Sequence, residues 1–240
     1  MSPESDVDLV VLAAGSGGTV TPLLEAGADG RLGVARIDGP GALTTGTAVA
    51  WVVVEGGAGS LRLGDETVTV SGRDDVFAAA GWSALVAPGQ TLTLDGDLRA
   101  TAVWRAETRV LVGRLIDPAD VADEARGEGT TRRRVRTYVD AGPLIVGETL
   151  NPPGLWSSYP PHRHEHEEIY LYRFDPPDGF GMQMRSESDS DERAVVVRDG
   201  RIERITSGWH PVVAAPGSTM YYLWALAGAD TLDTELDPRY

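Results

Sequence analysis

Cysteine and lysine are both absent from the 240 residues of this chain, and each absence removes a class of chemistry. Without cysteine there is no disulfide, no thiolate metal ligand and no cysteine nucleophile. All 21 basic residues are arginine, so Schiff-base catalysis, which needs a lysine amine, is excluded. Metal ions and the acid–base groups of carboxylates, histidine and tyrosine remain as means of catalysis.

Basic charge and long apolar runs are also scarce. The net charge is −15, so the sequence predicts no nucleic-acid partner and no anionic membrane partner, because both need a basic surface. No apolar run is long enough to span a bilayer, and the N-terminal MSPESDVDL lacks a signal-peptide pattern. We therefore expect a soluble, cytoplasmic protein.

Short β patterns fill most of the chain. Residues 67–70 (TVTV) and 91–94 (TLTL) alternate polar and apolar side chains, which is typical of strands with one buried face. Other runs, such as AWVVVE and SLRL, are separated by glycine, proline or aspartate. Strands this short, recurring about every 8 to 12 residues, predict an all-β sandwich or barrel.

One polar, charged stretch interrupts this rhythm and divides the chain. The sequence predicts an N-terminal β-barrel over residues 1–118 without a metal site, a linker over 119–137, and a C-terminal barrel over 138–240.

The linker stretch holds a run of arginines, for which two interpretations stay open. They could meet an anionic substrate, or, as is more common for such runs, pair with acidic neighbours at the surface. The residues concerned are Arg132, Arg133, Arg134 and Arg136.

The four histidines all lie in the C-terminal part. His162, His164 and His166 alternate in HRHEHEE, so an extended chain points them to one face, and Glu168 continues the row if the strand is unbroken. Neutral imidazoles and a carboxylate suit borderline divalent metals, which predicts a metal site. The alternative is a solvated hairpin edge. The apolar strand IYLYRF that follows favours a buried face and hence the metal site.

The spacing of these residues resembles the metal motif of the cupin superfamily, whose double-stranded β-barrel holds a divalent ion with three histidines and a glutamate. Carried over, this resemblance implies His162, His164, Glu168 and His210 as ligands of one divalent ion, which could be Zn, Mn, Fe, Co or Ni. His166 has the same parity, but three residues of one strand row cannot all reach one ion without a bend, so we favour His166 as a neighbouring or solvent-facing group and leave open whether it touches the metal.

A closer resemblance covers residues 144–228. The segments VGETLNPPGLWSSYPPHRHE, EEIYLYRF, PPDGFGMQ, WHPVVAAPG and YYLWALAG are similar to the 5-deoxy-glucuronate isomerase family of inositol catabolism. The resemblance implies a bicupin of two jelly-roll-like barrels. It also implies a metal-dependent aldose–ketose isomerase that converts the sugar acid 5-deoxy-D-glucuronate to 5-dehydro-2-deoxy-D-gluconate.

That reaction needs a proton-transferring group and contacts to the substrate, and the strands near Glu168 offer candidates for both. The catalytic candidates are Tyr170, Tyr172 and Tyr222, and the substrate-binding candidates are Gln183, Arg173, Arg185 and Tyr221. Buried tyrosines are more often packing residues, so that interpretation stays open for each of them.

Two other functions compete with the isomerase. The chain could bind a small sugar acid without turnover, or it could be a metal-dependent dioxygenase. A homodimer formed through sheet edges is a further expectation.

Overall fold

The computed structural model of the protein describes residues 10–27, 30–188, 191–227, 231 and 234–240. Strands dominate these ranges, and their helical segments are two single turns of 3-10 helix, η1 (Pro118–Asp120) and η2 (Gly129–Thr131). None of the helices described here has the length and apolar composition needed to cross a membrane.

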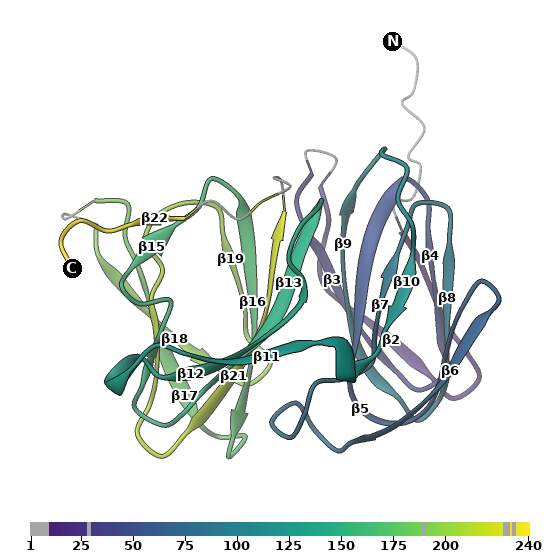
Figure 1. The fold of residues 1–240 in the computed structure, drawn as a ribbon, viewed down its shortest axis with the longest axis horizontal. Helices are drawn as coiled ribbons and strands as arrows, with labels where there is room; N and C mark the ends of the chain where they lie inside the picture. Colours follow the sequence, from purple (N-terminus) through teal and green to yellow (C-terminus); the bar gives the residue numbers. More distant parts are fainter. Residues whose placement is uncertain (1–9, 28–29, 189–190, 228–230, 232–233) are drawn as a thin grey trace, which may run out of the picture. The chain divides into compact units, whose positions relative to one another are not determined.

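The chain forms two compact units, Met1–Asp120 and Val121–Tyr240. In Figure 1 the first runs from purple to teal and the second from teal to yellow.

The first unit is a ten-stranded sheet whose main path runs β1-β4-β8-β5-β9-β3-β2. Its apolar side chains alternate as the sequence predicts: Leu92 and Leu94 are fully buried, whereas Thr91 between Gln90 and Leu92 is exposed. The strands are β1 (Val10–Ala14), β2 (Thr19–Leu24), β3 (Gly33–Asp38), β4 (Gly41–Thr45), β5 (Ala48–Leu63), β6 (Glu66–Arg73), β7 (Ser83–Val86), β8 (Thr91–Gly96), β9 (Arg99–Ala106) and β10 (Arg114–Ile116).

The glycines at 56, 57 and 59 do not end a strand as the sequence pattern suggests. AWVVVE and SLRL belong to one strand, β5, which pairs with β7 and β9 before these glycines and with β6 and β8 after them. A Cβ on Gly59 would lie 1.9 Å from the carbonyl oxygen of Asp95, so only glycine allows the backbones to approach this closely.

The second unit has two main sheets that enclose an aromatic core. The six-stranded sheet has the order β11-β12-β13-β21-β16-β19, and the four-stranded sheet has the order β14-β20-β17-β18. Tyr170, Tyr172, Phe174 and Tyr222 pack in the core with aliphatic side chains of both sheets. The strands are β11 (Ala122–Arg126), β12 (Arg133–Val139), β13 (Leu144–Asn151), β14 (Trp156–Ser157), β15 (His162–Arg163), β16 (Glu167–Asp175), β17 (Phe180–Arg185), β18 (Arg193–Arg198), β19 (Ile202–Ile205), β20 (Val212–Ala214), β21 (Thr219–Ala227) and β22 (Glu235–Leu236).

Residues 119–137, predicted as a linker, are largely structured. β11 and β12 pair as a hairpin, and β12 continues the sheet by pairing with β13. The alternation that normally identifies a strand is missing because β11 is exposed along its whole length, so no apolar face marks it in the sequence.

Candidate metal centre and active-site cavity

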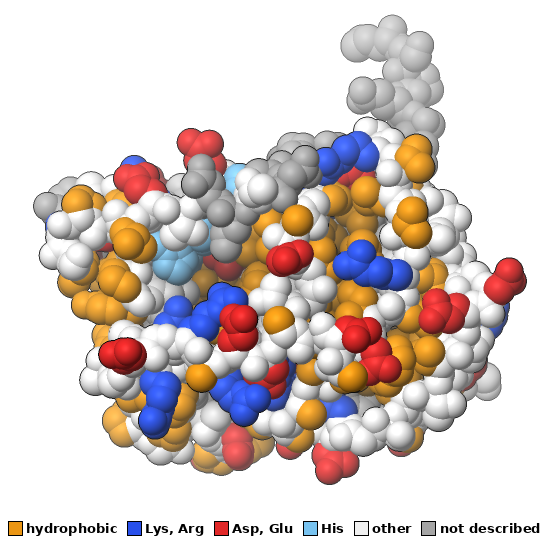
Figure 2. Space-filling model, viewed as in Figure 1, with side chains coloured by type: hydrophobic (Ala, Val, Ile, Leu, Met, Phe, Trp, Pro, Cys, Tyr) orange, Lys and Arg blue, Asp and Glu red, His pale blue; other side chains and the backbone are white. Residues whose placement is uncertain are grey.

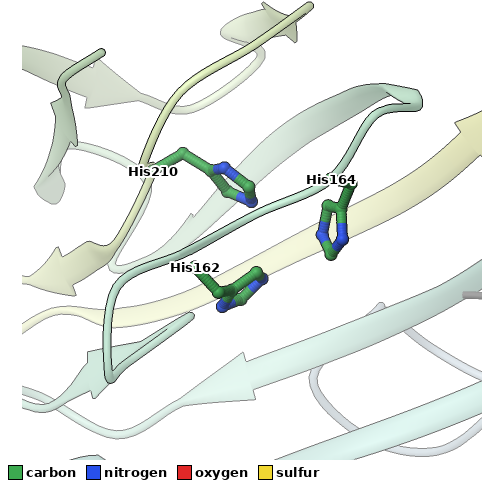
Figure 3. Close-up of side chains that lie close together, drawn as sticks. All are labelled: His162, His164 and His210. Carbon is green, nitrogen blue, oxygen red and sulfur yellow. The ribbon is translucent and has the colours of Figure 1, made fainter. Parts of the chain in front are cut away.

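Three histidines from two distant parts of the chain converge in the second unit. His162 lies on β15, His164 follows it in a turn, and His210 precedes β20. One ring nitrogen of each lies within 4.8 Å of the others, and Figure 3 shows the three rings facing a common point. No other group of three potential ligand side chains with this spacing occurs among the residues that the structure describes.

Glu168 on β16 brings its carboxylate to the same point. Its Oε2 lies 3.1 Å from His210 Nε2 and 3.6 Å from His164 Nε2. All three side chains are at least 95% buried. The structure therefore gathers the four predicted ligands around one small volume.

The turn between β15 and β16 makes this convergence possible. The row from His162 to Tyr172 is not one strand, because β15 pairs with β22 whereas β16 pairs with β21 and β19. A straight strand would separate His164 from Glu168 by about 13 Å. The turn instead folds the histidines back over the glutamate.

The donor atoms fit a divalent cation. His210 Nδ1 lies 3.0 Å from the carbonyl oxygen of Gly208, which assigns the ring proton to Nδ1 and leaves the Nε2 lone pair facing Glu168. Glu168 Oε2 and His210 Nε2 are buried and neither has a hydrogen-bond partner. Two lone pairs at this distance repel unless a proton or a metal cation lies between them. The 3.1 Å separation matches the edge of about 3.0 Å expected between neighbouring ligands at about 2.1 Å from a metal ion.

The protonation states also suit a metal. Burial opposes ionisation of Glu168, but the contact with His210 and the neighbouring imidazoles outweighs it, so the pKa of Glu168 lies below its usual value. Burial and the nearby His210 lower the pKa of His162 to about 3. At neutral pH the site thus offers a carboxylate and a neutral imidazole, the forms that bind metal.

His166 is not a member of the cluster. Its Nε2 is buried without a hydrogen-bond partner.

A cavity of about 280 Å³ opens beside the cluster. Two of the predicted catalytic tyrosines line it. Tyr170 shares a hydrogen bond of 2.8 Å with Ser158, and Tyr222 shares one with Ser157. Burial raises the pKa of both tyrosines, so both are neutral phenols at physiological pH. The lining residues are Arg126, Arg133, Val135, Thr149, Ser157, Ser158, Tyr159, Pro160, His162, His164, Glu168, Tyr170, Tyr222, Trp224, Leu226, Thr234 and Leu236.

Three predicted site residues lie in or near the barrel interior but do not line this cavity. Tyr172 is fully buried and its hydroxyl has no hydrogen-bond partner. Gln183 on β17 is also fully buried, and neither amide atom has a partner. Arg185 donates from Nη1 to the carbonyl oxygen of Arg204.

Tyr221 and Arg173 lie on the opposite face of the six-stranded sheet, where they cannot contact a substrate in the cavity. They are direct partners across β16 and β21, and each is one residue away from a side chain of the inner face. Tyr221 donates a hydrogen bond of 2.9 Å to Glu148 Oε1, and Arg173 Nη1 donates to the carbonyl oxygen of Tyr172. Neither residue lines the cavity, so this placement does not support their predicted role in substrate binding.

Two arginines and a tryptophan line the cavity although the sequence did not indicate them as site residues. Arg126 was not singled out, and Arg133 was considered only as part of an arginine run. Trp224 was also missed. Its indole covers Gly147, where a Cβ would lie 2.2 Å from Trp224 Cζ2, and its Nε1 donates to Thr149 Oγ1 at 3.1 Å. The YYLWALAG segment contains this tryptophan, but its sequence does not indicate whether the side chain points toward the cavity or away from it.

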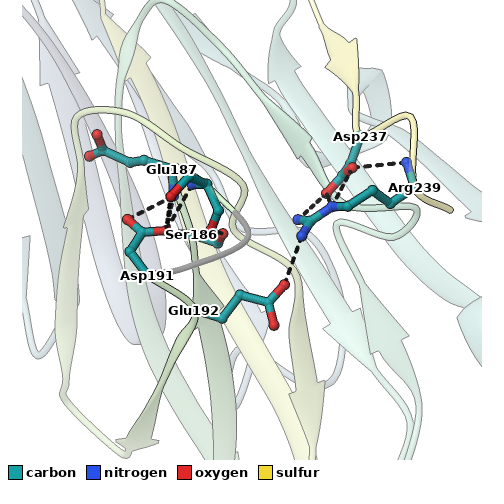
Figure 4. A network of polar contacts seen from close by, with 7 residues as sticks. Ser186, Glu187, Asp191, Glu192, Asp237 and Arg239 are labelled. Atoms are coloured by element: carbon teal, nitrogen blue, oxygen red, sulfur yellow. Dashed lines mark hydrogen bonds and ion pairs between the residues drawn. The ribbon is translucent and has the colours of Figure 1, made fainter.

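The C-terminal residues hold the histidine-bearing strand in place. β22 pairs with β15, and the Asp237 amide donates to the carbonyl oxygen of Pro161. Arg163 forms a two-pronged ion pair with Glu235, with distances of 2.7 and 2.9 Å. Arg239 bridges Asp237 and Glu192 (Figure 4). The segment 234–240 thus supports the strand that carries His162.

Comparison with known sequences places the chain in one family. The sequence model of the KduI/IolB family matches residues 38–240. A 5-deoxy-glucuronate isomerase of Geobacillus kaustophilus is 38% identical over 129 residues, which are 48% of this chain and 47% of the relative. One of Shouchella clausii is 30% identical over 190 residues, 68% of this chain and 70% of the relative. The matched part of this chain thus spans about half the length of the Geobacillus relative.

Solved structures confirm the predicted fold class, an all-β bicupin. An IolB-like protein from Salmonella typhimurium superposes with a TM-score of 0.80 at 22% identity, covering 92% of this chain and 97% of the other. A cupin 2 conserved barrel domain protein from Leptotrichia buccalis gives a TM-score of 0.53 at 12% identity, covering 88% and 89%. At these identities the likeness establishes the fold.

Proposed function

Since the chain belongs to the KduI/IolB family, we propose that it is a metal-dependent aldose–ketose isomerase of a sugar acid. The proposed reaction converts 5-deoxy-D-glucuronate to 5-dehydro-2-deoxy-D-gluconate in myo-inositol catabolism, a cytoplasmic pathway. Relatives at 30–38% identity carry the name 5-deoxy-glucuronate isomerase, which supports this choice of substrate.

The observation that carries the proposal is the convergence of four ligand side chains at the wall of a cavity. His162, His164, Glu168 and His210 would hold a divalent ion. When bound, such an ion supplies a Lewis acid and a template for two neighbouring substrate oxygens. His162, His164 and Glu168 line the cavity, so a substrate there has direct access to this point.

The tyrosines of the cavity are suited to donate hydrogen bonds to the substrate. An aldose becomes a ketose when hydrogen leaves C2 and arrives at C1 while the oxygens exchange their protons. Tyr170 and Tyr222 retain their phenolic protons because burial raises the pKa of both. They would donate hydrogen bonds to the substrate oxygens, with Ser158 and Ser157 fixing the orientation of each hydroxyl.

The test combines metal analysis with a proton NMR assay of the purified protein. We expect about one divalent ion per chain and conversion of 5-deoxy-D-glucuronate to the ketose. The His210→Ala variant should lose both the ion and the activity, whereas His166→Ala should keep both. Stoichiometric metal without turnover would refute the isomerase and favour a binding protein. Oxygen consumption with the same substrates would instead indicate a dioxygenase.

A further inference from the structure

Two arginines face each other on the wall of the cavity. Arg126 on β11 and Arg133 on β12 are direct cross-strand partners, so their side chains leave the hairpin on the same face. Both line the cavity that His162, His164 and Glu168 also line. Figure 2 shows basic side chains next to the pale-blue histidine surface on one face of the molecule.

Like charges directly opposite each other in a sheet are unfavourable unless an anion compensates them. On the other face of the same hairpin this compensation is built in, because Arg134 and Arg136 both pair with Asp123. On the cavity face Arg126 pairs with Glu124 at 2.9 Å, but both side chains are about half exposed and such a pair is weak. The face of the β11–β12 hairpin that lines the cavity therefore carries an excess of positive charge, although the net charge of the protein is −15.

We propose that Arg126 and Arg133 bind the carboxylate of the substrate and so select sugar acids over neutral sugars. This inference rests on the proposed function, because it assigns the acid end of that substrate. Arg133 Nη1 donates a hydrogen bond to the carbonyl oxygen of Thr131, which fixes the guanidinium and uses one of its five N–H donors. A planar guanidinium held in this way can receive a carboxylate through two parallel hydrogen bonds.

The arrangement also gives the substrate a direction. The histidines and Glu168 approach the cavity from β15, β16 and the turn between them, whereas the arginines approach from β11 and β12. A sugar acid bound with its carboxylate at Arg126 and Arg133 would present its hydroxyl-bearing end to Glu168 and the histidines. The cavity volume of about 280 Å³ lies near the lower end of small-molecule sites, about 300 Å³, which suits a single monosaccharide.

The test compares the binding of D-glucuronate and D-glucose, two sugars that differ in the carboxylate, to the metal-containing protein by calorimetry or ligand-observed NMR. Wild-type protein should bind D-glucuronate more tightly. Arg126→Gln and Arg133→Gln should reduce this preference about 10- to 100-fold, the loss expected for hydrogen bonds to a charged group. Arg134→Gln, on the other face of the hairpin, is the matched control and should keep it. Metal content and the thermal melting curve verify that each variant is folded, and Arg133→Lys, which keeps the charge but not the fork, should be intermediate.

The outcomes separate this inference from the proposed function. If the wild type shows no preference, or if both glutamine variants retain it, the carboxylate site is refuted. If the preference depends on the arginines while 5-deoxy-D-glucuronate is not converted, the site stands and the isomerase proposal fails. For an active enzyme, the same variants should raise KM for the acid far more than they lower kcat.

Discussion

The replacement Gly147→Ala tests whether the tryptophan wall of the cavity serves function. Gly147 on β13 lies directly opposite Trp224 on β21, and the indole ring covers the glycine. An alanine Cβ would lie 2.2 Å from Trp224 Cζ2 and 2.3 Å from the carbonyl oxygen of Arg136. Carbon atoms in contact prefer about 3.5–4.0 Å, so the ring has to move by about 1.3 Å or more.

The expected cost follows from this overlap. The Cβ overlaps with both the indole and the backbone oxygen of Arg136 on β12, so the ring has to move and β12 and β13 have to shift apart locally. Overpacking of this kind costs about 1–3 kcal/mol of unfolding free energy. Moving the ring also strains the hydrogen bond from Trp224 to Thr149, and both residues line the cavity. We therefore expect lower stability and a higher KM, with unchanged metal content because no ligand is touched.

A matched control exists in the first unit. Gly33 on β3 lies opposite Trp104 on β9, where an added Cβ would be 2.4 Å from Trp104 Cε2. Gly33→Ala should lower the unfolding free energy, measured by urea denaturation, through the overlap with the Trp104 indole, and it should leave KM unchanged. If Gly147→Ala leaves the unfolding free energy unchanged, the packing argument is wrong. If it lowers stability but leaves KM as in the Gly33→Ala control, Trp224 is only a core residue.

Four further predictions concern the metal centre. Glu168→Gln should weaken metal affinity, measured by chelator competition. Losing a residue that only supports a ligand costs about 10- to 100-fold in metal affinity, and the loss of Glu168 should cost more. His166→Ala should leave metal content unchanged, and loss of the ion would show that it is a ligand. Arg163→Met removes the ion pair with Glu235 and should weaken metal affinity modestly, an effect that Glu235→Gln should reproduce and that the double variant should not deepen. The unfolding free energy of the metal-free protein should decrease as the pH falls from about 6.5 toward about 3, because His162 takes up a proton in the unfolded chain in this range but not in the folded one. His162→Gln should lack this part of the pH dependence.

The fold could be predicted from local patterns because the alternation of buried and exposed side chains is local. Leu92 and Leu94 point into the core and Thr91 points out, as the TLTL pattern indicates. The convergence of His210 with His162, 48 positions earlier, is different. It depends on how two sheets close on each other, and the resemblance to a known motif supplied what local patterns could not.

Two features of the site could not be predicted from the sequence: which face of a buried strand each side chain occupies, and the presence of a strand that has no apolar face. Tyr222 lines the cavity whereas its neighbour Tyr221 does not, and a shift of one residue decides this. Sequence alone did not fix the phase of β21, because both of its faces are apolar or aromatic and buried. Arg126 was overlooked because β11 is exposed throughout and resembles a linker.

The strand that carries His162 has little backbone support of its own. β15 is two residues long and pairs with β22, which is equally short. Further attachments come from the Arg163–Glu235 ion pair, from the Arg163 guanidinium over the Trp209 ring and from the hydrogen bond of the Asp237 amide to the carbonyl oxygen of Pro161. Glu168 on β16 and His210 before β20 lie 3.1 Å apart through Oε2 and Nε2, so a bound cation would add a direct link between the histidines and β16. Metal binding should therefore slow amide hydrogen exchange in residues 162–163 and 235–237 together, since a ligand that binds the ordered state stabilises every contact on which that order depends.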